Sequence, residues 1–192
     1  KLNTWVRGGL NRRLVLAGEW YSSSSGAGFG AENAWLNTLA SALGRVTRFP
    51  TTGDTSKGYD DSVQSTLPPE VHVTTPYISD YLTDGVTVLA RDTVSTLRQW
   101  WNSDEGVPLF LIAQTYLDDP SHVGAFVVVE DYENVAGGYV GGSVVFICDC
   151  TTLWAKDVTS FRDTDFGITY DPGLEKNLRF GYNLCTRFRY AG

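Results

Sequence analysis

A glycine-rich stretch at residues 26–31 has the residue types that could bind the phosphates of a dinucleotide. It reads Gly-Ala-Gly-Phe-Gly-Ala between a predicted strand and a predicted helix, which formally matches the dinucleotide-binding fingerprint. In that fingerprint the glycines follow the strand immediately, and a second strand ends in an acidic residue about 20 residues later. Here serines fill residues 22–25, and Pro50 interrupts the place of the second strand. We therefore interpret the stretch as a loop or interface segment and expect no cofactor.

Histidine and cysteine spacing does not predict a metal site. His72 and His122 stand in separate turn-like regions, with no carboxylate or cysteine at ligand spacing. Cys148, Cys150 and Cys185 lack the double-pair pattern of zinc sites, so we expect free thiols. A bridge from one of the first two to Cys185, or to a neighbouring subunit, is the alternative.

Adjacent carboxylates could in principle perform acid–base chemistry on a glycosidic bond. They stand at residues 60–61, 118–119 and 130–131. Such chemistry requires a defined separation between two carboxyl groups, whereas acidic residues in turns and at strand edges are commonly solvated. The sequence thus predicts no catalytic residue and a protein that is not an enzyme. An enzyme, the alternative, would be marked by a closed pocket with a perturbed acid or base.

The composition favours a β-rich, acidic protein. The 192 residues include 20 Gly and 7 Pro, and the formal net charge is −7. Binding nucleic acid requires clustered Lys and Arg, so the acidic balance argues against a direct grip on DNA. No apolar run reaches the roughly 18 to 20 residues of a membrane span, and no export signal is expected at the N-terminus.

In the first half of the chain, two elements precede a long excursion. Alternation of apolar and polar residues over residues 12–21 predicts a half-buried strand. Residues 32–43 predict a helix with Trp35, Leu36, Leu39 and Leu43 on its inner side, ended by Gly44. Residues 49–76 are rich in Thr, Ser, Gly, Asp and Pro, with only a hint of strand at residues 71–73.

The second half predicts strands at residues 85–90, 107–116, 124–131 and 139–153, with a helix at residues 93–102. The last three strands are separated by turn residues and are expected to form a meander. Residues 178–190 alternate apolar and polar side chains, which predicts a long final strand.

Together these elements predict one domain over residues 1–192. We expect a mainly β fold of the α+β class, an antiparallel β-sandwich or barrel with one or two flanking helices. Long loop excursions are expected at about residues 22–30 and 49–76. An ordered loop with little apolar content of its own is expected to lie against a neighbouring subunit.

The order of elements between residues 85 and 153 resembles the central part of phage tail tube proteins, whose fold is shared with the type VI secretion tube. The resemblance lies in a strand (Val-Thr-Val-Leu-Ala, residues 86–90), a helix with Leu and Trp (residues 97–103), and the strands at residues 108–112, 124–129 and 142–147. It implies six copies closing into a ring, and rings stacking into a hollow tube through which DNA passes without specific binding. It also implies a virion location after assembly in the host cytoplasm, with other tail proteins as further partners.

On this reading, particular residues are expected at subunit contacts or facing the lumen. The contact candidates are Trp5, Ser22, Phe29, Tyr59, Tyr77, Trp154, Arg187 and Arg189. The lumen candidates are Asp118, Asp119, Glu130, Asp131 and Glu133, since acidic groups do not hold DNA. The alternatives are a carbohydrate- or receptor-binding β-sandwich, a tail terminator or a capsid-associated protein.

Overall fold

The computed structural model describes residues 1–19, 21–22, 27–51, 70–73, 81–90, 97, 109–116, 119–133, 139–148, 153 and 172–188. Three helices lie in this part of the chain, α1 (Leu2–Arg7), α2 (Gly30–Ala42) and α3 (Pro172–Thr186). The strands are β1 (Arg13–Ala17), β2 (Tyr21–Ser22), β3 (Ala27–Gly28), β4 (Glu70–His72), β5 (Val88–Ala90), β6 (Leu109–Tyr116), β7 (Asp119–Glu133) and β8 (Tyr139–Ile147). The α+β class predicted from the sequence is confirmed.

The main sheet has the strand order β1-β8-β7-β6. Strands β6, β7 and β8 form the predicted antiparallel meander. Strand β1 runs parallel to β8, with Arg13 opposite Ser143. This parallel pair departs from the expected all-antiparallel sandwich or barrel, and the described strands form an open sheet with β1 and β6 outermost.

A glycine in β8 allows the parallel pairing. A Cβ on Gly142 would lie 2.8 Å from the carbonyl oxygen of Val6 and closer still to that of Arg12. The segment joining α1 to β1 therefore lies directly against β8, where the Ser143 amide donates to the Arg12 carbonyl at 3.0 Å, an ordinary length for a backbone hydrogen bond. Residues without a side chain permit such close backbone approach.

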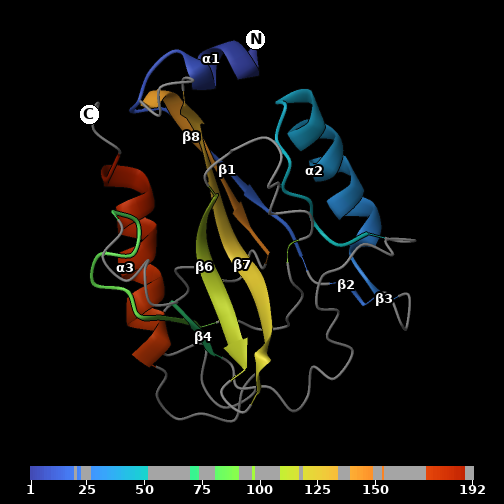
Figure 1. The fold of residues 1–192 in the computed structure, drawn as a ribbon, viewed down its shortest axis with the longest axis vertical. Helices are drawn as coiled ribbons and strands as arrows, with labels where there is room; N and C mark the ends of the chain where they lie inside the picture. The colour runs from blue at the N-terminus through green and yellow to red at the C-terminus, as the bar shows by residue number, and fades with distance from the viewer. Residues whose placement is uncertain are drawn as a thin grey trace.

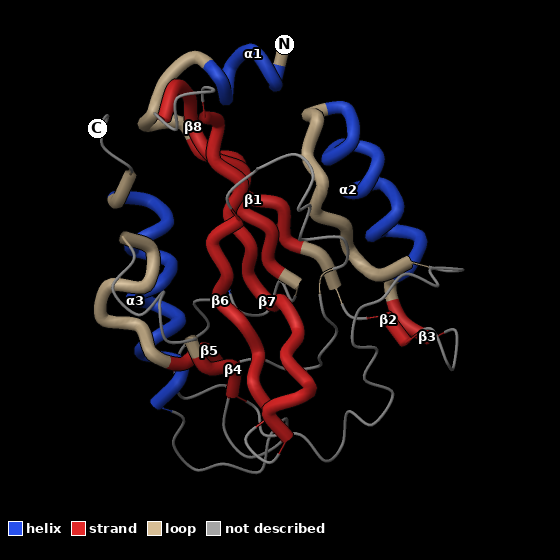
Figure 2. Tube along the Cα trace, in the orientation of Figure 1, coloured by secondary structure: helices blue, strands red, loops and turns tan. Residues whose placement is uncertain are grey.

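Helices cover both faces of this sheet. Figure 1 shows α2 and α3 on opposite sides of it, with α1 at one end. One face carries Phe146, whose ring lies 5.9 Å from that of Phe49, just beyond α2. The other face carries Arg13, which reaches the end of α3. The pair β4–β5 lies beside α3 (Figure 2). Side chains from both faces form one core, including the fully buried Phe126, Phe146, Ile147 and Phe180.

Helix α2 confirms the predicted helix and its terminus, with one correction. Gly44 has φ +68°, its amide donates to the Ser41 carbonyl, and the next amide donates to Ala40, which is a Schellman cap. Leu43 is buried as expected, but Trp35 is 78% exposed. The buried position two residues before it, on the opposite side of the helix, belongs to Asn33, whose amide bonds to backbone on the neighbouring segments.

The C-terminal strand prediction is wrong, because residues 172–186 form α3. Its buried positions are Asn177, Phe180, Asn183 and Leu184, spaced three and four residues apart as on one helix face. Leu178 and Tyr182, which the alternating pattern places on the same strand face as Phe180, are exposed in the helix. This segment therefore carries an alternating apolar pattern and a helical pattern together. Its contacts with the sheet and with residues 81–85 favour the helix.

Several other expectations fall on short elements or outside the described residues. The expected loop at residues 22–30 contains the β2–β3 pair, in which Tyr21 lies opposite Gly28. The hint of strand at residues 71–73 corresponds to β4, and β8 ends at Ile147 rather than at residue 153. The predicted helix at residues 93–102, apart from Leu97, and most of the excursion at residues 49–76 lie outside the described residues.

Candidate functional site

An apolar groove of about 830 Å³ lies between α1, β1 and α3. We call it the α3 groove. Its apolar lining includes Trp5, Val15, Leu178, Tyr182, Leu184 and Phe188. Asn11, Arg13 and Cys185 are among its polar members, and Cys185 is an exposed free thiol. The volume falls within the range of small-molecule sites.

Arg13 fixes the end of α3 beside this groove. Its guanidinium donates to the carbonyl oxygens of Asn183 (3.3 Å), Leu184 and Arg187 (2.5 Å), at the end of the helix. The last carbonyls of a helix lack intrahelical donors, although that of Asn183 also accepts from the Arg187 amide at 2.9 Å. The guanidinium also lies 4.7 Å from the Phe188 ring centroid. Burial lowers the pKa of Arg13 from its ordinary value, and Tyr81 opposes this shift. An arginine stays protonated at neutral pH, so it supplies a cation where the helix dipole favours one.

Polar contacts with residues 82–84 hold the same helix on its inner side. The Asn183 amide donates to the carbonyl oxygens of Leu82 and Asp84, both at 2.9 Å. The Asp84 carboxylate pairs with Arg179 at 3.0 Å and with Arg187 at 2.6 Å. These anchors hold the outward-facing side chains of α3 in a defined place along the groove.

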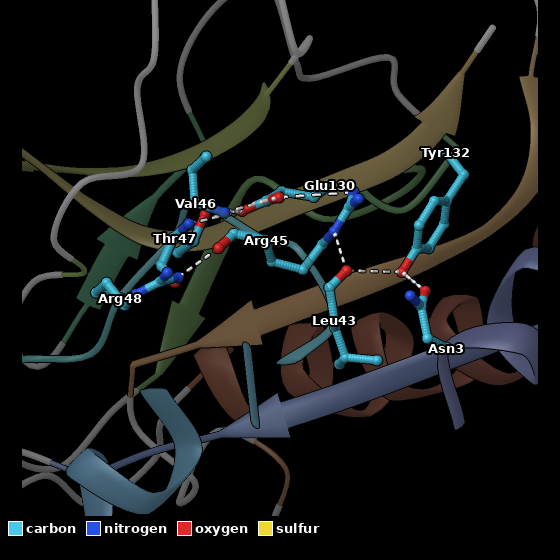
Figure 3. A network of polar contacts seen from close by, with 8 residues as sticks. All are labelled: Asn3, Leu43, Arg45, Val46, Thr47, Arg48, Glu130 and Tyr132. Carbon is cyan, nitrogen blue, oxygen red and sulfur yellow. Dashed lines mark hydrogen bonds and ion pairs between the residues drawn. The ribbon is translucent and has the colours of Figure 1, made fainter. Parts of the chain in front are cut away.

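On the opposite face of the sheet, the carboxylate of Glu130 joins β7 to the segment that follows α2 (Figure 3). Glu130 is only 1% exposed. It accepts hydrogen bonds from the amides of Val46 (3.1 Å) and Thr47 (2.7 Å), and the Arg45 guanidinium lies 3.7 Å away. A buried carboxylate with these donors is a structural anchor, because its lone pairs are already occupied.

Tyr132 extends this network toward the N-terminal helix (Figure 3). Its hydroxyl lies 3.0 Å from Oδ1 of Asn3 and 3.4 Å from the Leu43 carbonyl, and its ring lies 4.0 Å from the Arg45 guanidinium. Burial raises the pKa of Tyr132, with Arg45 and Arg7 opposing the shift. Burial likewise lowers the pKa of Arg48, whose guanidinium donates to the Arg45 carbonyl at 2.5 Å.

Two asparagines one turn apart fix α2 to the backbone segments beside it. Asn33 accepts from the Glu19 amide (3.1 Å) and donates to the carbonyls of Glu19 (2.7 Å) and Pro50 (2.9 Å). Asn37 exchanges two hydrogen bonds with the backbone of Phe49. Helix α2 is thus held through its inner face, and Trp35 projects from its outer face.

The structure places three of the expected contact residues near its surface. Trp5 is 46% exposed and lines the α3 groove, and Phe29 is 43% exposed at the start of α2. Arg187 is half-exposed and already paired with Asp84 within the chain. These three do not converge on one patch, because Phe29 belongs to α2 and the other two to the region of α1 and α3.

The acidic lumen candidates divide into buried and undescribed groups. Glu130 and Asp131 are buried, with exposed fractions of 1% and 5%, so the expectation that they face a lumen is wrong. Asp131 instead contributes to the electrostatic environment of Arg13. The backbone of β2 contains Ser22 and that of β7 contains Asp119 and Glu133, but their side chains are not described. Outside the described residues lie Tyr59, Tyr77, Trp154, Arg189 and Asp118.

Comparison with known proteins provides no relative for this chain: no family model, curated protein or solved structure matches it. Within the described ranges, no group of three or more His, Cys, Asp or Glu side chains is arranged to hold a metal ion. No helix in those ranges is long and apolar enough to cross a membrane. The surface and the packing of the described residues therefore carry the functional argument.

Sequence reasoning missed the residues that define the groove and the outer face of α2. Leu178 and Tyr182 could have been assigned outward from the three- and four-residue spacing of Asn177, Phe180 and Leu184. Arg13 gave no local signal, because its acceptors lie some 170 residues later in the chain.

Proposed function

We propose that this chain is a structural subunit that functions by assembling with copies of itself. The observation that carries the proposal is the exposure of large apolar side chains on both sides of the sheet, Trp35 on α2 and Trp5, Leu178 and Tyr182 around the α3 groove. Aromatic side chains are enriched at protein interfaces, and contiguous apolar patches are uncommon on monomers. Assembly removes this surface from water.

The assembly we propose is the tail tube of a bacteriophage. The antiparallel meander β6–β7–β8 supports this reading, since these strands are among the elements on which the resemblance rests. Six copies close into a ring, rings stack into a filament, and the chain is a virion protein assembled in the host cytoplasm alongside other tail proteins. The net charge of −7 suits a conduit through which DNA is ejected without being bound.

The outer strands of the sheet offer a route to the expected sandwich or barrel in the assembled state. Strands β1 and β6 each have one sheet neighbour among the described strands. Edge strands present unpaired backbone groups that can add a strand from another chain. Closure of the sheet is proposed here for the ring, with strands of adjacent copies as the partners.

Negative-stain electron microscopy of the purified protein tests the tube directly. We expect rings or hollow tubes with sixfold end views. Compact particles without a central channel, at concentrations where the protein does associate, would refute the tube while leaving a different assembly to explain the exposed aromatics.

A second function, a carbohydrate- or receptor-binding module, is favoured by the α3 groove itself. Its volume suits a small ligand, and Trp5 and Tyr182 supply rings on which sugar faces can stack. This function predicts a monomer or trimer whose tryptophan fluorescence changes on titration with glycans. A glycan panel that leaves the fluorescence unchanged would remove this candidate.

A further inference from the structure

Resting on the proposed self-assembly, the geometry points to one specific contact between copies. We propose that the outer face of α2, centred on Trp35, inserts into the α3 groove of the next copy. Helices α2 and α3 lie on opposite sides of the same sheet (Figure 1). Helix α2 carries the exposed indole of Trp35, and α3 lines the apolar groove. Each copy therefore has one of each and can join a neighbour at both sides.

The outer face of α2 has the chemistry of a docking surface rather than of a solvated helix. Its exposed residues are Ala31, Glu32, Ala34, Trp35, Thr38, Ser41 and Ala42, which include a single charge. Small side chains beside the indole let a partner surface approach closely. The bonds of Asn33 and Asn37 to the neighbouring backbone already fix the helix, so little backbone order is lost on binding.

The α3 groove has room for that surface. Gly181 lies in its lining, and a Cβ added there would meet nothing within 4 Å. Trp5, Leu178 and Tyr182 provide aromatic and aliphatic walls. A buried tryptophan removes about 150–250 Å² from water, and a hollow of about 830 Å³ accommodates an indole together with part of the adjoining helix surface.

The charges of the two surfaces are complementary. Copies with a net charge of −7 repel one another unless the contacting surfaces offset it. The outer face of α2 carries the carboxylate of Glu32. Beside the groove, the Arg12 guanidinium lies 5.8 Å from the Trp5 ring centroid. Arg13 also lines the groove, with its guanidinium bonded to carbonyls at the end of α3. A weakly acidic surface thus meets a basic one.

This contact joins two different surfaces, so it is heterologous. Repetition of a heterologous contact generates a ring if the rotation closes and a filament if it does not. A symmetric α2-to-α2 contact would stop at a dimer. The proposed contact therefore explains how a ring or filament could be built with one repeated interface.

The test uses two variants, each of which removes one half of the contact. Trp35→Glu removes the projecting side chain and leaves the groove intact, whereas Gly181→Trp fills the groove and leaves α2 intact. Gly181→Ala is the matched control, because its methyl group meets nothing and leaves the groove open. Circular dichroism establishes that each variant is folded, and Leu178→Asp replaces Gly181→Trp if the latter misfolds.

Sedimentation velocity reads out the association. We expect each blocked variant alone to associate at least about thirtyfold more weakly than wild type, as for loss of an interface hot spot. Their equimolar mixture should form a one-to-one dimer, because one intact α2 face and one intact groove remain. Alkylation of Cys185 in the Trp35→Glu copy, followed by mass spectrometry of its peptide, should be slower in that dimer than in the Trp35→Glu variant alone, since Cys185 lines the groove that the partner occupies.

The outcomes separate this inference from the proposed function. Wild type that assembles while both blocked variants also assemble would refute the contact and leave self-assembly standing. Loss of association in Trp35→Glu alone, with no dimer on mixing, would assign the α2 face to a different partner surface and also refute it. Wild type that stays monomeric at every concentration would refute the proposed function itself.

Discussion

Replacement of Glu130 with alanine should lower the free energy of unfolding by about 3–5 kcal/mol, the cost of removing one partner from a buried ion pair. The structure supplies the reasons. The substitution leaves the amides of Val46 and Thr47 without their acceptor and the Arg45 guanidinium without its anion. Each unsatisfied buried donor alone costs about 1–3 kcal/mol. With a total stability of about 5–15 kcal/mol for a typical domain, this loss is large.

Glu130→Gln provides the graded comparison. The amide keeps the volume and one acceptor oxygen but loses the charge, so we expect a smaller cost of about 1–2 kcal/mol, the difference between charged and neutral hydrogen bonds. Glu32→Ala is the matched control, because Glu32 is exposed on α2 and its loss should cost less than about 0.5 kcal/mol.

Urea denaturation followed by tryptophan fluorescence measures all three variants at low protein concentration. The expected order of destabilisation is Glu130→Ala, then Glu130→Gln, then Glu32→Ala. A single unsatisfied buried donor costs at least about 1 kcal/mol. A Glu130→Ala variant whose free energy of unfolding lies within about 1 kcal/mol of wild type would therefore refute the anchoring role of this carboxylate.

Three further predictions concern other anchors. Arg13→Met keeps the aliphatic stem but removes the cation from the end of α3. It should lower the free energy of unfolding by about 2–3 kcal/mol and speed amide hydrogen exchange in the last turn of that helix. Unchanged exchange there would contradict the capping role. Gly142→Ala should destabilise the protein by about 1–3 kcal/mol through overpacking, whereas Gly181→Ala should stabilise it by about 0.8–1 kcal/mol, both measured by urea denaturation. Because the pKa of Tyr132 is raised in the folded state, its hydroxyl ionises at lower pH in the unfolded chain, and stability falls as pH rises above about 10. Tyr132→Phe should show a smaller fall in stability over the same range. An equal fall would be evidence against the raised pKa.

Local sequence patterns predicted the elements whose signal is strong and unambiguous. The apolar runs of β6, β7 and β8 are separated by turn residues, so the meander followed from the sequence. The helical spacing before Gly44 likewise predicted α2 and its Schellman cap. In both places the local preference and the tertiary contacts agree.

Tertiary contacts determined the C-terminal helix and the orientation of α2, which local patterns did not predict. Residues 177–190 carry an alternating pattern and a helical pattern together, and contacts of Asn183 and Phe180 with distant parts of the chain select the helix. Trp35 was expected inside because it is apolar. The inner face of α2 includes Asn33 and Asn37 beside the expected leucines, since backbone groups of residues 19, 49 and 50 bond to their amides. No local pattern reveals such partners.

The candidate site was predicted only in part, for the same reason. Trp5 was expected at a contact surface and lines the α3 groove. The paired carboxylates at residues 130–131 were expected to be solvated, yet both are buried. Acidic residues are mostly exposed, and a buried acid is recognisable only once its donors are known.

The central claim is that the chain associates with copies of itself, and sedimentation velocity of the wild-type protein over a wide concentration range tests it most directly. The account predicts a sedimentation coefficient that rises with concentration toward a closed ring or a growing filament, and that this rise is lost in Trp35→Glu. A single species with the mass of one chain, 21.1 kDa, at every concentration would contradict it.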